Sequence, residues 1–173
     1  LTSVSPLSLM AGNILALGTT TLVQSIVWIA SIAIIGPQII DQIPNAAELE
    51  IEPLTLAYVF LFFIAGYFLF SVILAGIGSA TTSAKEAGPI TAMVLLPAGL
   101  PVWLAPAILG ATDGEVARIL SFIPITAPTT MMLRIGSGDV SNVEILASLV
   151  VTALAGAVML FVSARIFRAG LLL

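Results

Sequence analysis

The chain has 173 residues, of which 60% are hydrophobic and only 8% are charged, whereas soluble domains carry about 25% charged residues. With a mean hydropathy of +1.21, this composition excludes an ordinary soluble domain and predicts an integral membrane protein. The absence of cysteine and histidine excludes disulfides, thiolate metal sites and histidine-based catalytic triads, and five basic residues are too few for a nucleic-acid partner.

Two stretches in the first half are apolar and long enough to cross a bilayer, which takes about 20 residues. The first covers residues 14–35 and is expected to end at Gly36-Pro37, because proline lacks the N–H that continues a helix. The second covers residues 54–78. The segment between them is acidic and has prolines near both ends, so it is expected to be an aqueous loop.

A third span is expected over residues 89–110 and a fourth over residues 144–166. Each proline inside a helix removes a backbone hydrogen bond, so we expect the third span to be kinked or broken and packed inside a bundle. The prolines in question are Pro89, Pro97, Pro101 and Pro106.

The segment 111–142, between the third and fourth spans, is apolar but interrupted. Pro124 and Pro128 limit any helix to short pieces, while its apolar side chains need a nonpolar surface. We expect a re-entrant or interfacial helical hairpin that caps the bundle from outside; the alternative is a loop resting on lipid headgroups. Asp113 and Glu115 are expected to be solvated loop charges.

The distribution of charge predicts the orientation in the membrane. Four spans place both termini and the turn at Lys85 on one side, which carries three basic residues and one acidic residue. The opposite side carries two basic and eight acidic residues. Because lysine and arginine favour cytoplasmic loops, both termini are predicted to be cytoplasmic. The predicted fold is therefore an all-α, polytopic transmembrane bundle, a single domain over residues 1–173 in the cell membrane.

The sequence offers few candidate residues for catalysis or for binding a metal or cofactor. The sequence contains no phosphate-binding loop, zinc-protease motif or nucleophile elbow, so we expect no enzyme activity, no catalytic or metal site and no cofactor bound by this chain. The predicted spans lack interior charges, which disfavours a secondary carrier. Thr20 and Gln24 make the first span the most polar one. They either line a translocation path or, as we favour, form interhelical hydrogen bonds.

Small residues recur at a spacing of four at the start of the first span, at Gly12, Ala16 and Thr20, and on the fourth span, at Ser148, Thr152 and Gly156. Such rows let helix backbones approach closely in lipid. We therefore expect these faces of the two spans to pack tightly against other helices.

Three motifs occur in series: SPLSLMAGNIL near the start, the serine-rich turn SATTSAKEAG, and IPITAP with RI and GDV after it. Together with the SARIFRAGLL tail, they resemble the C-terminal part of type-2 ATP-binding-cassette exporter permeases of the NatB-like sodium-efflux kind. The resemblance implies six spans, of which this chain would hold the last four. We accordingly expect a fragment that lacks two N-terminal spans and an external domain.

By the same resemblance, the permease would form a homodimer or pair with another permease, over a cytoplasmic ATPase that binds ATP and Mg²⁺. The contacts that couple it to the ATPase would lie at Asn13, Ser83, Lys85 and Glu86. The hairpin would be an external lid over the exit path, with Pro124, Pro128 and Arg134 as its marked residues. The expected function is thus the permease subunit of an ATP-driven exporter. The alternative is a non-transporting accessory subunit of a larger respiratory or photosynthetic membrane complex.

Overall fold

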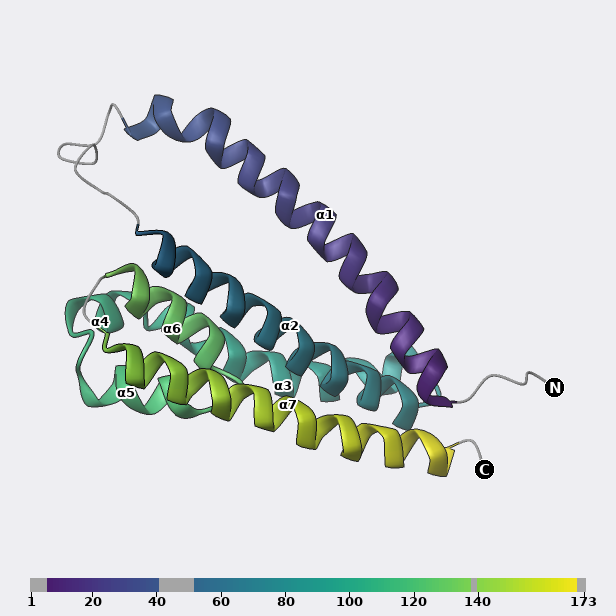
Figure 1. The fold of residues 1–173 in the computed structure, drawn as a ribbon. Coiled ribbons are helices and arrows are strands. Elements are labelled where there is room, and N and C mark those ends of the chain that lie inside the picture. Colours follow the sequence, from purple (N-terminus) through teal and green to yellow (C-terminus); the bar gives the residue numbers. More distant parts are fainter. Residues whose placement is uncertain (1–5, 41–51, 138–139, 171–173) are drawn as a thin grey trace. The chain divides into compact units, whose positions relative to one another are not determined.

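A computed structural model describes residues 6–40, 52–137 and 140–170, apart from some side chains inside the helices. The regular elements in these ranges are all helices, as the sequence predicts. They are α1 (Pro6–Ile40), α2 (Pro53–Ala80), α3 (Ala84–Trp103), α4 (Ala105–Gly110), α5 (Glu115–Phe122), α6 (Ala127–Gly136) and α7 (Asn142–Gly170) (Figure 1). The chain divides into two compact units, Leu1–Pro53 and Leu54–Leu173.

The first unit contains the single helix α1. Its apolar part spans Leu15–Ser31, and large side chains such as Ile26 and Trp28 are exposed. The predicted end at Gly36-Pro37 is wrong, because the helix continues to Ile40. A proline removes only its own N–H from the helical ladder, so the helix can continue beyond it when the following residues keep helical geometry.

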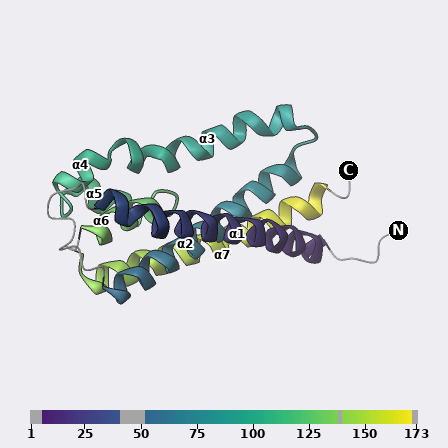
Figure 2. The same ribbon diagram turned by 90° about the horizontal axis from the view of Figure 1, so that it is seen from above.

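The second unit is built on two long helices, α2 and α7. Among the described residues, Pro53–Ala80 and Asn142–Ile166 are long and apolar enough to cross a membrane. The predicted spans 54–78 and 144–166 lie within these two helices. α2 and α7 run in the same direction (Figure 1). α3, which follows α2 in the chain, runs in the opposite direction (Figures 1 and 2). The total of four spans stays a prediction.

The third predicted span is broken, as its prolines indicate. Leu104 separates α3 from α4. Pro106 lies in the first turn of α4, where backbone N–H groups have no acceptor within the helix, so that the absence of one costs nothing. Hydrogen bonds bridge the break: the Leu104 amide donates to the Leu100 carbonyl and the Ile108 amide to the Leu104 carbonyl, both at 2.9 Å. The chain therefore bends at this point while most of its backbone stays satisfied.

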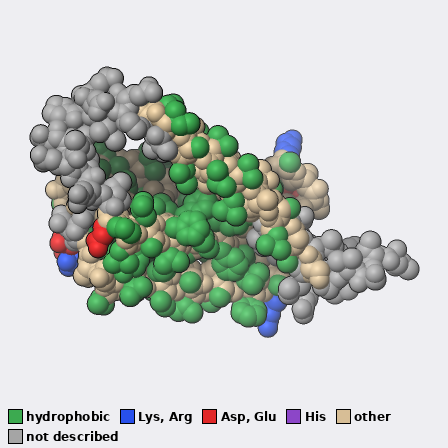
Figure 3. All heavy atoms as spheres, turned by 45° about the horizontal axis from the view of Figure 1, so that its top comes forward, with side chains coloured by type: hydrophobic (Ala, Val, Ile, Leu, Met, Phe, Trp, Pro, Cys, Tyr) green, Lys and Arg blue, Asp and Glu red, His purple; other side chains and the backbone are tan. Residues whose placement is uncertain are grey.

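The core of the second unit forms around α6. On one side, Met131 and Ile135 pack with Phe62 of α2 and Ile145 of α7, and all four side chains are buried. On the other side, Leu133 packs against a buried cluster of Ile108, Ala117 and Leu120 from α4 and α5. The short helix α6 thus packs against the long helices α2 and α7 on one side and against the shorter α4 and α5 on the other. The surface seen in Figure 3 is largely hydrophobic, with few charged side chains, which suits a lipid environment.

α2 and α7 also touch directly, through small residues. The Ser163 hydroxyl of α7 lies against Gly76 of α2 and donates a hydrogen bond of 2.9 Å to the Val72 carbonyl. Ser148 and Thr152, from the predicted small-residue row of α7, are fully buried. Gly156, from the same row, faces Phe68 of α2. The predicted tight packing of this face is confirmed.

Candidate functional site: a helical hairpin held by Arg134

α5 and α6 form a helical hairpin between α4 and α7. α5 ends at Phe122 because Pro124 forces the preceding residue, Ile123, into an extended conformation. The amides of Thr126 and Ala127 then donate to the Ile123 carbonyl at 3.0 and 2.8 Å, which closes the turn. Pro128 stands in the first turn of α6, the position where proline suits a helix. The two prolines therefore limit the helices as the sequence predicts.

The tip of the hairpin reaches the middle of α2. Pro128 packs so closely on Gly66 that a Cβ atom at position 66 would lie 2.9 Å from the proline Cβ. Gly66 is near the midpoint of the 28-residue helix α2. α6 consequently extends along the inside of the bundle, while much of α5 is exposed. The turn between them lies near the middle of α2 and not near its first residues (Figure 1).

Side-chain hydroxyls satisfy the backbone of this deep turn. Thr126 donates to the carbonyls of Leu120 and Ile123, at 2.7 and 3.1 Å. Ser148 of α7 donates to the Ser121 carbonyl at 2.5 Å. Non-helical backbone is tolerated at membrane depth only where protein or an aqueous cavity satisfies its polar groups. The threonines and serines of this apolar segment thus provide what a re-entrant turn requires.

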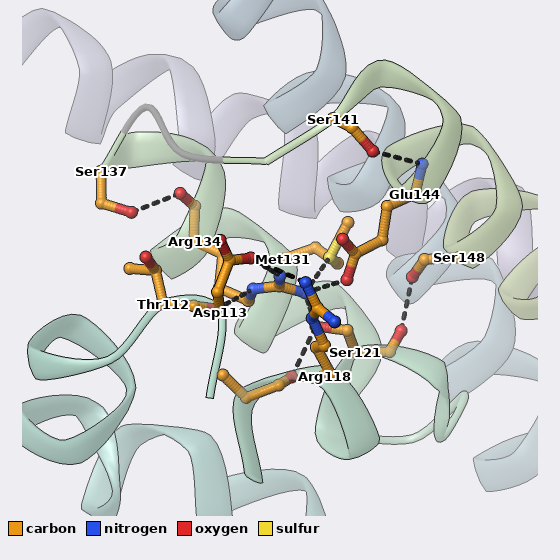
Figure 4. A network of polar contacts seen from close by, with 11 residues as sticks. Thr112, Asp113, Arg118, Ser121, Met131, Arg134, Ser137, Ser141, Glu144 and Ser148 are labelled. Atoms are coloured by element: carbon orange, nitrogen blue, oxygen red, sulfur yellow. Dashed lines mark hydrogen bonds and ion pairs between the residues drawn. The ribbon is translucent and has the colours of Figure 1, made fainter. Parts of the chain in front are cut away.

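Arg134, near the end of α6, is fully buried and anchors the other end of the hairpin (Figure 4). Its Nη1 donates to the Glu144 carboxylate at 2.6 Å and to the Ser121 hydroxyl at 2.8 Å. Its Nε donates to the Thr112 carbonyl at 2.7 Å, and Nη2 lies 3.4 Å from the Asp113 carboxylate. One guanidinium therefore joins α6 to α5, to the α4–α5 turn and to the start of α7.

The charges around Arg134 balance. Two carboxylates, Asp113 and Glu144, meet two cations, Arg134 and the exposed Arg118, which is 3.4 Å from Asp113. We call these four residues the Arg134 cluster. Asp113 is exposed in the α4–α5 turn, as expected of a solvated loop charge, with 61% of its side chain accessible, and it also pairs with Arg134 and Arg118. A buried cation costs several kcal/mol unless it is paired, and this pairing explains the position of Asp113.

The predicted ATPase-coupling residues have different structural roles. Ser83 caps α3 by accepting a hydrogen bond from the Glu86 amide at 3.4 Å. The Glu86 carboxylate accepts hydrogen bonds from the amide and hydroxyl of Thr82, at 3.1 and 3.0 Å. This reciprocal arrangement is a variant of the capping box and fixes the α2–α3 turn. Lys85 is exposed beside it, while Asn13 lies in α1 with its side chain outside the described part.

The two predicted path-lining residues lie on the exposed surface of α1. Thr20 donates to the Ala16 carbonyl of its own helix at 3.2 Å. Gln24 is exposed.

Sequence reasoning missed the residues that hold the hairpin in place. Glu144 was interpreted only as the start of the last span, and Ser121 was not singled out. A detectable signal was present, since Arg134 is the one basic residue in the largely apolar stretch 119–142 and needs a carboxylate partner. Several acidic residues flank the segment, however, and the sequence alone does not choose among them.

The comparisons with known proteins agree with this architecture. The family described as ABC-2 family transporter protein matches residues 1–165, nearly the whole chain. The chain belongs to the ABC-2 transporter family. It is accordingly part of the membrane permease component of an ABC transporter. This finding favours the transporter interpretation over the accessory subunit.

This ABC-2 chain is similar to proteins from an archaeon and a bacterium. It is 25% identical over 166 residues to the uncharacterized protein MJ1024 of Methanocaldococcus jannaschii, covering 96% of this chain and 39% of that protein. It is 30% identical over 126 residues to the uncharacterized protein YhaP of Bacillus subtilis, covering 72% of this chain and 30% of YhaP. The chain thus spans well under half the length of either relative. No solved structure matches it.

Proposed function

We propose that this chain is the C-terminal membrane part of a permease subunit in an ATP-driven exporter. The observation that carries the proposal is the hairpin, whose tip packs against the middle of α2 at Gly66. In an ABC-2 bundle, a re-entrant hairpin of this depth would close a path through the membrane and would have its polar backbone satisfied by the surrounding protein. By the proposal, α5 and α6 form the external lid, with Pro124 and Pro128 shaping its tip and Arg134 its base.

The remaining parts of the proposal concern topology and partners. The basic residues near the α2–α3 turn and the end of α7 support cytoplasmic termini in a four-span part of the cell membrane. A cytoplasmic ATP-binding-cassette ATPase would bind ATP and Mg²⁺, and two permease copies or two related permeases would enclose the path. Sodium is the first substrate to test, because of the NatB-like resemblance.

Within the α2–α3 turn, the structure favours Lys85 as the residue that contacts the ATPase. Glu86 is engaged by Thr82 and Ser83 supplies the cap, so both have structural roles. The exposed Lys85 ammonium is the charge that this rigid turn presents to a partner. An acidic surface on the ATPase would be its complement.

The test uses the full-length permease and its ATPase in sodium-loaded vesicles, with ATP hydrolysis and efflux of radioactive sodium measured together. We expect Lys85→Ala to lower efflux per ATP by about tenfold, the effect of losing about 1.4 kcal/mol at a charged contact. Lys85→Arg keeps the charge and is the matched control, expected to retain coupling. Equal efflux per ATP in all three proteins would contradict coupling through this turn.

A further inference from the structure

Arg134 forms more polar contacts than any other residue in the described hairpin, and these contacts extend beyond the hairpin itself. Its guanidinium reaches a backbone carbonyl, a hydroxyl and two carboxylates, and Met131 Sδ lies 3.8 Å from Nη1. Every buried side-chain nitrogen and oxygen in the described residues has a partner. The guanidinium therefore has several polar partners in this conformation. It would lose several hydrogen bonds at once if α6 moved away from α5 and α7.

The contacts of Arg134 differ in strength. The pair with Glu144 is short, 2.6 Å, and its side chains are only 0% and 17% exposed. The pair with Asp113 is longer, 3.4 Å, and the carboxylate is 61% exposed and shared with Arg118. Buried pairs are costly to break because a charge is left without a partner, whereas exposed pairs contribute little. Arg134 is accordingly held most firmly to α7.

Other contacts join the hairpin to α7 as well. Ser148 donates to the Ser121 carbonyl, and Ile145 packs with Met131. Toward α2, the hairpin packs apolar side chains against Phe62 and places Pro128 on Gly66. Apolar surfaces slide at lower cost than a buried ion pair breaks.

We propose that Arg134 is a positioning residue that sets the depth of the hairpin by fixing it to α7, so that α5, α6 and α7 pivot as one body about the contact of Ser163 with Val72 and Gly76, away from the first half of α2. The inference rests on the proposed function for its role in transport, because it states which side of the lid opens. Arg134 touches no substrate in this proposal and acts through the hairpin tip. Opening would then separate the tip from α2 while Ser121 and Glu144 stay in place.

The test measures distances by electron spin resonance in the full-length permease with its ATPase. This chain has no cysteine, so spin labels are attached after Ile123→Cys at the tip and Val158→Cys on α7, two partly exposed positions. Any cysteine elsewhere in the full-length protein is replaced first. We expect one narrow distance distribution, and Arg134→Met is expected to broaden it and to raise the population of longer distances about tenfold or more, as local opening becomes accessible.

Two variants control this experiment. Arg118→Met removes an arginine that is 58% exposed and pairs only with Asp113 in the cluster, and it is expected to leave the distribution narrow. Arg134→Lys restores a charge for Glu144 but not the guanidinium fork, so it is expected to recover part of the narrow peak. If Arg134→Met does not fold, Glu144→Gln replaces it, since the amide keeps the shape and removes the ion pair. An unchanged distribution in the variant that folds would overturn the proposal.

A second label pair separates this inference from the proposed function. Labels after Ile123→Cys and Leu74→Cys report the distance from the tip to α2, and ATP is expected to shift it in the parent protein but not after Arg134→Met. Absence of an ATP effect in the parent would contradict the exporter mechanism, while the pair on α7 would still decide the role of Arg134. An ATP effect that survives Arg134→Met with a narrow α7 distribution would contradict the role of Arg134 alone.

Discussion

The contact between α2 and α7 at Gly76 leads to a quantitative prediction. A Cβ atom at position 76 would meet the Ser163 hydroxyl and would lie 3.1 Å from the Ser163 Cβ. Gly76→Ala must therefore push the two helices apart or displace the hydroxyl from the Val72 carbonyl. Gly78, two residues further on the same helix, has open space around it. Gly78→Ala is thus a matched control with the same chemical change.

The expected magnitude follows from these contacts. Overpacking a well-packed site costs about 1 to 3 kcal/mol, and an interhelical hydrogen bond in a membrane protein contributes about 0.6 kcal/mol. Alanine in place of glycine inside a helix gains about 1 kcal/mol in either variant, so this term cancels in the comparison. Gly76→Ala is therefore expected to be about 1.6 to 3.6 kcal/mol less stable than Gly78→Ala.

The measurement is reversible unfolding of the full-length permease in mixed micelles, followed by circular dichroism as the denaturing detergent increases. Gly76→Ala combined with Ser163→Gly removes the obstructing side chain, and we expect it to recover most of the stability lost by steric conflict. Equal stability of the two glycine variants would refute the close packing of α2 on α7. Failure of the double variant to recover stability would indicate that the cost arises elsewhere than at Ser163.

Two further predictions concern the hairpin. Ser148→Ala removes the hydrogen bond to the Ser121 carbonyl and is expected to lower the unfolding free energy by about 0.6 to 1.7 kcal/mol; the control Ser79→Ala, whose hydroxyl bonds only its own helix, is expected to change it less in the same detergent titration. Gly66→Ala places a methyl group against the rigid ring of Pro128, so we expect about 1 to 3 kcal/mol of destabilisation and a broader distance distribution between labels on the hairpin tip and α2. A Gly66→Ala protein as stable as Gly78→Ala would contradict the depth assigned to the tip.

Much of the fold follows from local signals in the sequence. Long uncharged stretches predict α2 and α7, and prolines predict both the break at Leu104 and the two short helices of the hairpin. The continuation of α1 through Pro37 was not predictable in this way, because one missing N–H does not decide whether neighbouring residues keep helical geometry. The residue at which a helix ends therefore depends on small differences in free energy between helical and non-helical backbone.

The site was less predictable than the fold, for a physical reason. Arg134 was marked as a lid residue from its place in an apolar segment, but its partners come from the α4–α5 turn, α5 and α7. Choosing Glu144 and Asp113 among the acidic residues requires the depth and direction of the hairpin. These follow from packing at Gly66 and Phe62, which no local pattern encodes.

The pairing of Arg134 with Glu144 also bears on how the protein is made. The arginine precedes its carboxylate partner by ten residues, so it leaves the ribosome first and meets the membrane without that partner. In the proposed re-entrant arrangement, an arginine is costly in hydrocarbon until it is paired. Asp113 comes earlier in the chain but is 61% exposed, so the buried pair can form only after Glu144 has been synthesised. By this proposal, the hairpin would reach its final depth only once the start of α7 is available, even if the long helices enter the membrane during synthesis.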